Sequence, residues 1–94
     1  MIKKFKMTRA EKFASTHIVD IYSACVDCLD NGSLSQDDIN SLKDLRDDER
    51  QVGGGWRLGE IAAAILDIYD IEKYTGKNKN VYDFVRLWFD LGNN

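Results

Sequence analysis

The sequence predicts an all-α protein, folded as one compact domain of four helices. Apolar residues recur at spacings of three and four in four separate stretches, which is the period of an amphipathic helix, and no stretch alternates convincingly with period two. Polar residues suited to helix caps flank these stretches. The chain has no proline, so clusters of glycine mark the ends of its elements instead. Because the first and fourth helices differ in length, we do not expect an ideal bundle.

The first helix is expected over residues 8–31. Thr8 and Glu11 have the spacing of a capping box at its start, and Asn31-Gly32 would supply a left-handed cap at its end. Residues spaced by three and four give it a wide apolar face: Phe13, His17, Ile21, Ala24 and Cys28, with Ile18, Tyr22, Cys25 and Leu29 beside them. We therefore expect His17, the only histidine, to be a partly buried helix residue.

The second helix is expected over residues 35–51. Ser35 and Asp38 form a second capping-box pair, and Leu34 and Ile39 stand where a hydrophobic staple would place them. Its apolar stripe is narrow and consists of Ile39, Leu42 and Leu45. The opposite side is charged and carries Asp37, Asp38, Lys43, Asp44, Asp47 and Asp48. The glycine run 53–55 then breaks the helical pattern and serves as a connector.

The third helix is expected over residues 57–75. Leu58, Ile61, Ile65 and Ile68 hold one stripe, and further apolar residues widen it to most of the circumference. A helix that is apolar on so many sides is typical of the centre of a domain. The alanines at 62–64 would let a neighbouring helix approach closely.

The fourth helix is expected over residues 80–91. Asn80 and Asp83 are placed as its capping pair. Its expected inner face consists of Val81, Phe84, Val85, Trp88 and Leu91. Tyr82 and Phe89 lie off that face, so we expect an exposed aromatic residue among them.

The composition fits a single domain over residues 1–94, with residues 1–7 as a basic N-terminal tail. The 94 residues are 44% apolar and 31% charged, which is ordinary for a globular protein. A chain of this length buries about 60–65% of its unfolded surface, enough for one core without metals or disulfides. The longest strongly apolar run, 61–66, is too short to cross a bilayer, and no secretory signal is recognisable. We therefore expect a cytoplasmic protein without membrane association, whose Cys25 and Cys28 are reduced.

Charge is distributed unevenly along the chain, whose formal net charge is −3. Residues 1–12 carry a net charge of +4, residues 13–49 carry −7, and the remainder is neutral. The basic residues of the first segment are Lys3, Lys4, Lys6, Arg9 and Lys12. Pairing within the molecule would account for this arrangement. The sharper alternative is that the acidic middle faces a basic partner.

The stretch from Asp27 to Ile39 resembles part of an EF-hand calcium loop, which has oxygen ligands at positions 1, 3, 5, 7, 9 and 12 and glycine at position 6. With Gly32 at position 6, the candidate ligands are Asp27, Asn31, Ser33 and Asp38. Position 3 is Leu29, which has no ligand oxygen, and no second loop is visible. Helix capping explains the same residues. We therefore expect no metal or other cofactor, with a degenerate calcium site as the alternative.

No catalytic arrangement is recognisable in the sequence, so we expect no enzyme. Cys25 and Cys28 form a CxxC pair, but near a helix C-terminus, where the dipole does not favour a thiolate. A zinc site would need four ligands, and His17 is the only further soft donor. The glycine run 53–55 lacks both the Gly-Lys-Ser/Thr of a P-loop and a preceding strand.

Nucleic-acid binding is an alternative that the composition disfavours. The basic N-terminal residues could contact phosphates, and Phe5 could stack on a base. However, the helix that follows the glycine run is mostly Ile, Ala and Leu, so it offers no polar face for reading bases. The domain is also acidic. We expect no direct, sequence-specific binding to nucleic acid.

The remaining features predict a small non-catalytic protein-interaction module. By analogy of size and charge, it would act as a stoichiometric regulator or inhibitor of the type that phages and mobile elements direct at nucleic-acid enzymes. Its expected contact surface, facing a basic protein, consists of Asp37, Asp44, Asp47, Asp48 and Glu49, with Trp56 as an anchor and Arg57 beside it. The alternative is a structural homo-oligomerisation unit. Tyr82, Trp88 or Phe89 would then lie in a homodimer interface.

Overall fold

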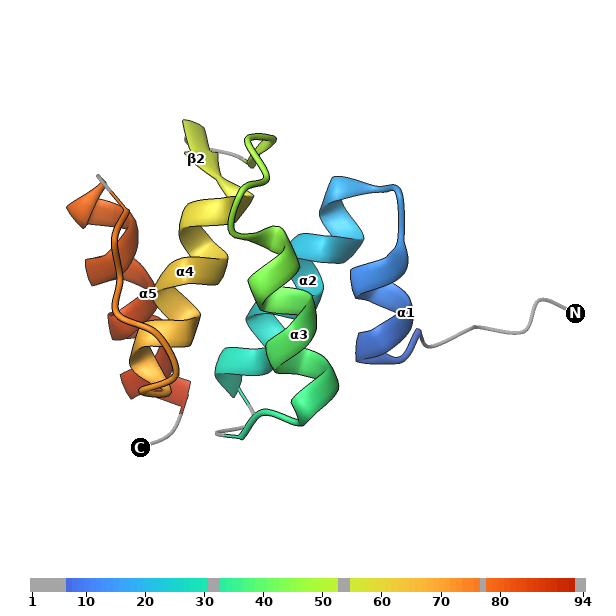
Figure 1. Cartoon of the computed structure of the whole chain (residues 1–94), viewed down its shortest axis with the longest axis horizontal. Coiled ribbons are helices and arrows are strands. Elements are labelled where there is room, and N and C mark those ends of the chain that lie inside the picture. The colour runs from blue at the N-terminus through green and yellow to red at the C-terminus, as the bar shows by residue number, and fades with distance from the viewer. Residues whose placement is uncertain (1–6, 31–32, 53–54, 77, 93–94) are drawn as a thin grey trace, which may run out of the picture.

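The fold is predominantly helical, as the sequence predicts (Figure 1). The computed structural model describes residues 7–30, 33–52, 55–76 and 78–92. In chain order its elements are α1 (Arg9–Ala14), α2 (Ile18–Asp30), α3 (Gln36–Leu45), β1 (Gln51–Val52), β2 (Trp56–Arg57), α4 (Leu58–Ile68) and α5 (Lys79–Gly92). The described residues thus contain five helices and a two-stranded sheet, where the sequence analysis expected four helices and no strand.

The helix expected over residues 8–31 is divided into α1 and α2. Ser15 adopts an extended conformation, with φ −68° and ψ 151°, and ends α1. Its hydroxyl accepts the backbone N–H of His17 at 3.0 Å and donates to Asp20 at 2.7 Å. Such local side-chain bonds compete with helical ones, which explains the break. His17 therefore lies exposed in the bend, and its expected partial burial is wrong.

Two of the three predicted capping pairs form, at the starts of α1 and α3. The Thr8 hydroxyl accepts the backbone N–H of Glu11, whose carboxylate accepts the N–H of Thr8 in return. Ser35 and Asp38 make the same reciprocal pair at the start of α3. These bonds satisfy N–H groups that have no partner within the helix.

The region after α3 differs from the prediction. The helix ends at Leu45 instead of residue 51, and β1 pairs antiparallel with β2, placing Val52 opposite Trp56. Gly55, at the hairpin, has φ +79°, a left-handed conformation that suits glycine. Val52 and Trp56 both favour strands, and two residues on each side are enough to make the hairpin.

Helix α4 lies at the centre, as predicted, and packs against α2, α3 and α5 (Figure 1). Seven of its residues are buried, among them Leu58, Ile61 and Ile65. It ends at Ile68 instead of residue 75. Asp70 has φ +59°, and the N–H of Ile71 donates to the carbonyl of Leu66. This is the Schellman arrangement that terminates helices, with aspartate in the place usually held by glycine.

Helix α5 begins slightly earlier than expected. The Asn78 side chain accepts the backbone N–H groups of Asn80 and Val81, so Asn78 caps this helix in place of the predicted Asn80. Val81 and Val85 are buried against the rest of the core. No helix in the described ranges has both the length and the apolar character needed to cross a membrane.

Gly59, in the first turn of α4, sets how closely α4 approaches the end of α3. Its N–H donates to the carbonyl oxygen of Asp48 at 2.9 Å. A Cβ atom at this position would lie 2.8 Å from that oxygen and nearer still to the carbonyl oxygen of Arg46. Because both atoms belong to the backbone, they cannot move aside as a flexible side chain would.

We predict that Gly59→Ala lowers the free energy of unfolding by about 2 kcal/mol, since the added methyl group forces the two segments apart. Helix propensity alone predicts the opposite sign, a gain of about 1 kcal/mol for alanine over glycine. Urea unfolding followed by circular dichroism measures the difference. Unchanged or increased stability would show that the close approach is not required.

Candidate functional site

Helix α1 is fixed to the corner between α2 and α3 by two ion pairs. Nη1 of Arg9 donates to Oδ2 of Asp38 at 2.6 Å, and Nη2 donates to the carbonyl oxygen of Asp27 at 3.3 Å. Nζ of Lys12 donates to Oδ2 of Asp27 at 2.7 Å and to the hydroxyl of Ser23 at 3.0 Å. Two of the basic N-terminal residues are therefore used inside the molecule. The others, Lys3, Lys4 and Lys6, and also Phe5, lie outside the described residues.

These two ion pairs involve candidate ligands of the calcium loop that the sequence resembles. The carboxylates of Asp27 and Asp38 already have cationic partners, and Leu29 is buried in the core. Ser33 is exposed, and Asn31 lies outside the described residues. Within the ranges that the structure describes, no three His, Cys, Asp or Glu side chains converge on a point where a metal could bind.

Four carboxylates remain exposed along α3 and the segment after it, and we call them the acidic face: Asp37, Asp44, Asp47 and Glu49. None of them makes a hydrogen bond or an ion pair with the described part of the chain. Asp37 and Asp44 are seven residues apart, two helical turns, and so lie on one side of α3 about 10 Å from each other.

Asp48, which the sequence analysis grouped with these carboxylates, has a different role. Its side chain is only 16% exposed, and Oδ2 accepts Nη2 of Arg50 at 2.6 Å. Oδ1 accepts the backbone N–H of Arg50 at 2.9 Å. The hydrogen bond from the Arg50 side chain holds the pKa of the Asp48 carboxyl below its usual value. Asp48 thus fixes the entry to the hairpin and contributes little free charge to the surface.

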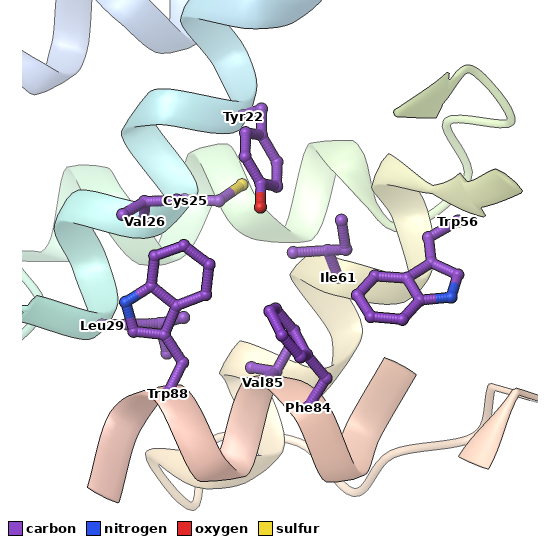
Figure 2. A pocket seen from close by; sticks show the side chains of 9 residues that line it. All are labelled: Tyr22, Cys25, Val26, Leu29, Trp56, Ile61, Phe84, Val85 and Trp88. Atoms are coloured by element: carbon purple, nitrogen blue, oxygen red, sulfur yellow. The ribbon is translucent and has the colours of Figure 1, made fainter. Parts of the chain in front are cut away.

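The hairpin residues Trp56 and Arg57 are directed to different surroundings. The Trp56 ring packs against Phe84 of α5, with ring centroids 4.9 Å apart. Trp56 lines a hollow together with Tyr22 of α2 and Trp88 of α5 (Figure 2). No residue of α3 lines this hollow, so the Trp56 side chain does not join the acidic face. Arg57 is exposed and borders a polar depression with Glu60 and Lys79. Gly53 and Gly54 lie outside the described residues.

The two cysteines belong to the core. Both are free and buried in α2, and burial raises the pKa of the Cys28 thiol to about 12. Burial raises the pKa of Cys25 as well. A thiol with so high a pKa carries almost no thiolate at neutral pH, and the thiolate is the form that reacts with disulfides and metals.

An apolar surface that the sequence analysis did not assign lies between α2, the hairpin and α5. Its centre is a narrow hollow of about 10 Å³, which Tyr22 and Cys25 border from α2, Trp56 from the hairpin, and Phe84 and Trp88 from α5 (Figure 2). We call this surface the apolar track. It consists of Val19, Tyr22, Val26, Trp56, Phe84, Leu87, Trp88 and Leu91.

The inner face predicted for α5 is only partly correct: Val81 and Val85 are buried as expected. Leu91 is 68% exposed and Phe84 is exposed, although both were expected on the inner face. Tyr82, expected off that face, donates its hydroxyl to Asp67 at 3.0 Å, and Phe89 packs edge-on against Tyr69. These two aromatics are therefore engaged inside the molecule. Leu87 follows Phe84 by three residues, and this spacing was the sequence signal for a second apolar side of α5. In the structure, Leu87 is 55% exposed.

Comparison with known proteins adds no assignment. No protein-family model matches the chain, and searches of curated proteins and of solved structures found no significant match.

We predict that calcium does not bind at the α2–α3 corner, because Arg9 and Lys12 occupy its carboxylates. Titration with up to about 5 mM calcium, above the range of weak extracellular sites, should leave the amide resonances of Asp27, Ser33 and Asp38 in place. Magnesium at the same ionic strength is the control for salt effects. Saturable shifts with calcium alone, confined to this corner, would contradict the prediction.

Proposed function

We propose that the protein is a small non-catalytic interaction module that binds a basic protein partner through the acidic face. The proposal rests on the exposed carboxylates of the acidic face, which do not pair with a cationic side chain of the described residues. Arg9, Lys12 and Arg50 are each paired with a nearby carboxylate, and Arg46 pairs with Glu72 at 2.5 Å. The acidic face keeps four exposed negative charges.

Such a cluster suits electrostatic recognition. The two carboxylates of α3 are separated by about 10 Å, close to the Debye length at physiological ionic strength, so they act on an approaching charge together. Clustered charge of one sign steers a complementary partner and disfavours partners of like charge. The consequence for binding is a fast, salt-sensitive association.

The non-catalytic part of the proposal rests on where the reactive groups lie. The thiols of Cys25 and Cys28 are buried with raised pKa values, and His17 is exposed in the bend after α1. Two free cysteines also suit a reducing, cytoplasmic setting. A small module of this kind would act by occupying its partner, as a stoichiometric regulator or inhibitor does. A phage or mobile-element origin remains an analogy of size and charge.

A charge-only probe tests the acidic face. We predict that a heptalysine peptide at low salt shifts amide resonances of α3 and of Asp47 to Glu49 more than those of other elements. The triple variant Asp37→Asn, Asp44→Asn and Asp47→Asn should bind the peptide about tenfold more weakly, because each exposed charge contributes a few tenths of a kcal/mol or more.

The matched control is the triple variant Glu11→Gln, Asp70→Asn and Glu72→Gln, which makes the same change in net charge in α1 and after α4, outside the acidic face and outside α5. It should lose at most about twofold in affinity. Equal losses in the two triple variants, or shifts spread evenly over the described residues, would show that only net charge matters and that the acidic face is not a site.

A further inference from the structure

We propose that the apolar track is a docking groove for a basic amphipathic helix of another protein. This interaction surface is separate from the acidic face and goes beyond the proposed function, because it depends on apolar contacts. The motivating observation is that α2 and α5 each have an apolar stripe with the same residue spacing, and that both stripes border one surface hollow.

The stripes have the spacing of helix-binding surfaces. On α2, the residues Val19, Tyr22 and Val26 stand at positions i, i+3 and i+7. On α5, the spacing is repeated by Phe84, Leu87 and Leu91. Residues at this spacing lie on one side of a helix, in a row that covers two turns.

Shared lining residues join the stripes into one track. Val19 and Phe84 border the same hollow of about 460 Å³, together with Trp56. A second hollow, of about 340 Å³, lies along Phe84, Leu87 and Leu91. Val19 is 72% exposed, so this side of α2 has no cover within the described part of the chain.

The dimensions favour a helix over a small ligand. Pockets for small molecules enclose roughly 300–1,000 Å³ and bury most of the ligand, whereas the enclosed centre of the track holds about 10 Å³. The two larger hollows are open to solvent. A partner helix needs only a groove into which side chains at i, i+3 or i+4, and i+7 can insert.

The charges at the edge of the track select a basic partner. Asp83 and Asp90 lie four residues before and three residues after Leu87, and Asp30 lies one turn beyond Val26. All three are exposed. The neighbouring cation on α5, Arg86, is itself 3.7 Å from a carboxylate oxygen of Asp90.

The same charges argue against the two other occupants of an apolar surface. A second copy of the chain, docked track to track, would bring Asp83 and Asp90 of both copies to one interface, which is unfavourable for like charges. An anionic membrane surface would be repelled for the same reason. A helix with leucines on one side and lysines beside them can make apolar contacts with the track and ion pairs with the carboxylates at its edge.

The hydroxyl of Tyr22 adds a polar point to the groove. Figure 2 shows this oxygen directed toward the hollow, and it makes no hydrogen bond with the described residues. A polar group in a mainly apolar groove fixes the orientation of what binds there.

The test uses a 14-residue peptide built from leucine and lysine, with the leucines at i, i+3, i+4 and i+7. The two tryptophans of the chain, Trp56 and Trp88, both line the track. Their fluorescence therefore reports binding of a peptide that has no aromatic residue. We expect a saturable blue shift, and at least about tenfold weaker binding by a scrambled peptide or by one with glutamate in place of lysine.

Two pairs of substitutions locate the site. Leu87→Ser with Leu91→Ser should weaken peptide binding at least about tenfold and leave the circular dichroism melt unchanged, since both side chains are exposed. Asp83→Asn with Asp90→Asn should weaken it about threefold at low salt. The matched control, Glu11→Gln with Asp70→Asn, removes the same charge from exposed positions outside both surfaces and should have no effect.

Three results would overturn the proposal. The first is binding of the glutamate peptide as tight as that of the lysine peptide, which would show that the carboxylates at the edge do not select a basic partner. The second is full binding by the Leu87→Ser, Leu91→Ser variant, which would place the peptide elsewhere. The third is a concentration-dependent dimer of the unmodified chain in sedimentation, abolished by the same two substitutions, which would make a second copy the occupant. Failure of the heptalysine test alone concerns only the acidic face.

Discussion

The ion pair between Arg9 and Asp38 is the interaction on which the arrangement of the N-terminal half depends. Helix α1 has six residues and none of them is fully buried; its main apolar contact is Phe13, which is partly buried against the core. A helix this short is not stable alone in water. Arg9 fixes it to α3, and Lys12 fixes it to α2. Asp38 also caps α3 through Ser35, so a single carboxylate holds two helices in place.

This internal pairing determines which charges remain for binding. It neutralises Asp27 and Asp38 and leaves the four carboxylates of the acidic face without a cationic partner in the described ranges. The apolar track lies where α5 and the hairpin meet α2, and no residue of α3 lines its hollows. The two surfaces therefore differ in both chemistry and position, and a partner for one need not contact the other.

Much of the helical content and the N-terminal capping of α1 and α3 could be predicted, because both depend on residues close together in sequence. The central position of α4 followed from its apolar residues on every side. The break at Ser15 could not be predicted, since local side-chain bonds there outweigh a continuous apolar pattern. The outward side of α5 was also missed. Its apolar residues cover more than one face, and only packing decides that Val81 is buried and Leu91 is exposed.

A double-mutant cycle on Arg9→Gln and Asp38→Asn tests the central claim most directly. Asparagine keeps an oxygen for the cap at Ser35 and removes only the charge. The two native side chains are 19% and 11% exposed, so solvent screens the pair only in part. We predict a coupling free energy of about 1–2 kcal/mol in urea unfolding. A coupling below about 0.3 kcal/mol would be within the additivity of independent sites, and would contradict the view that this pair fixes α1.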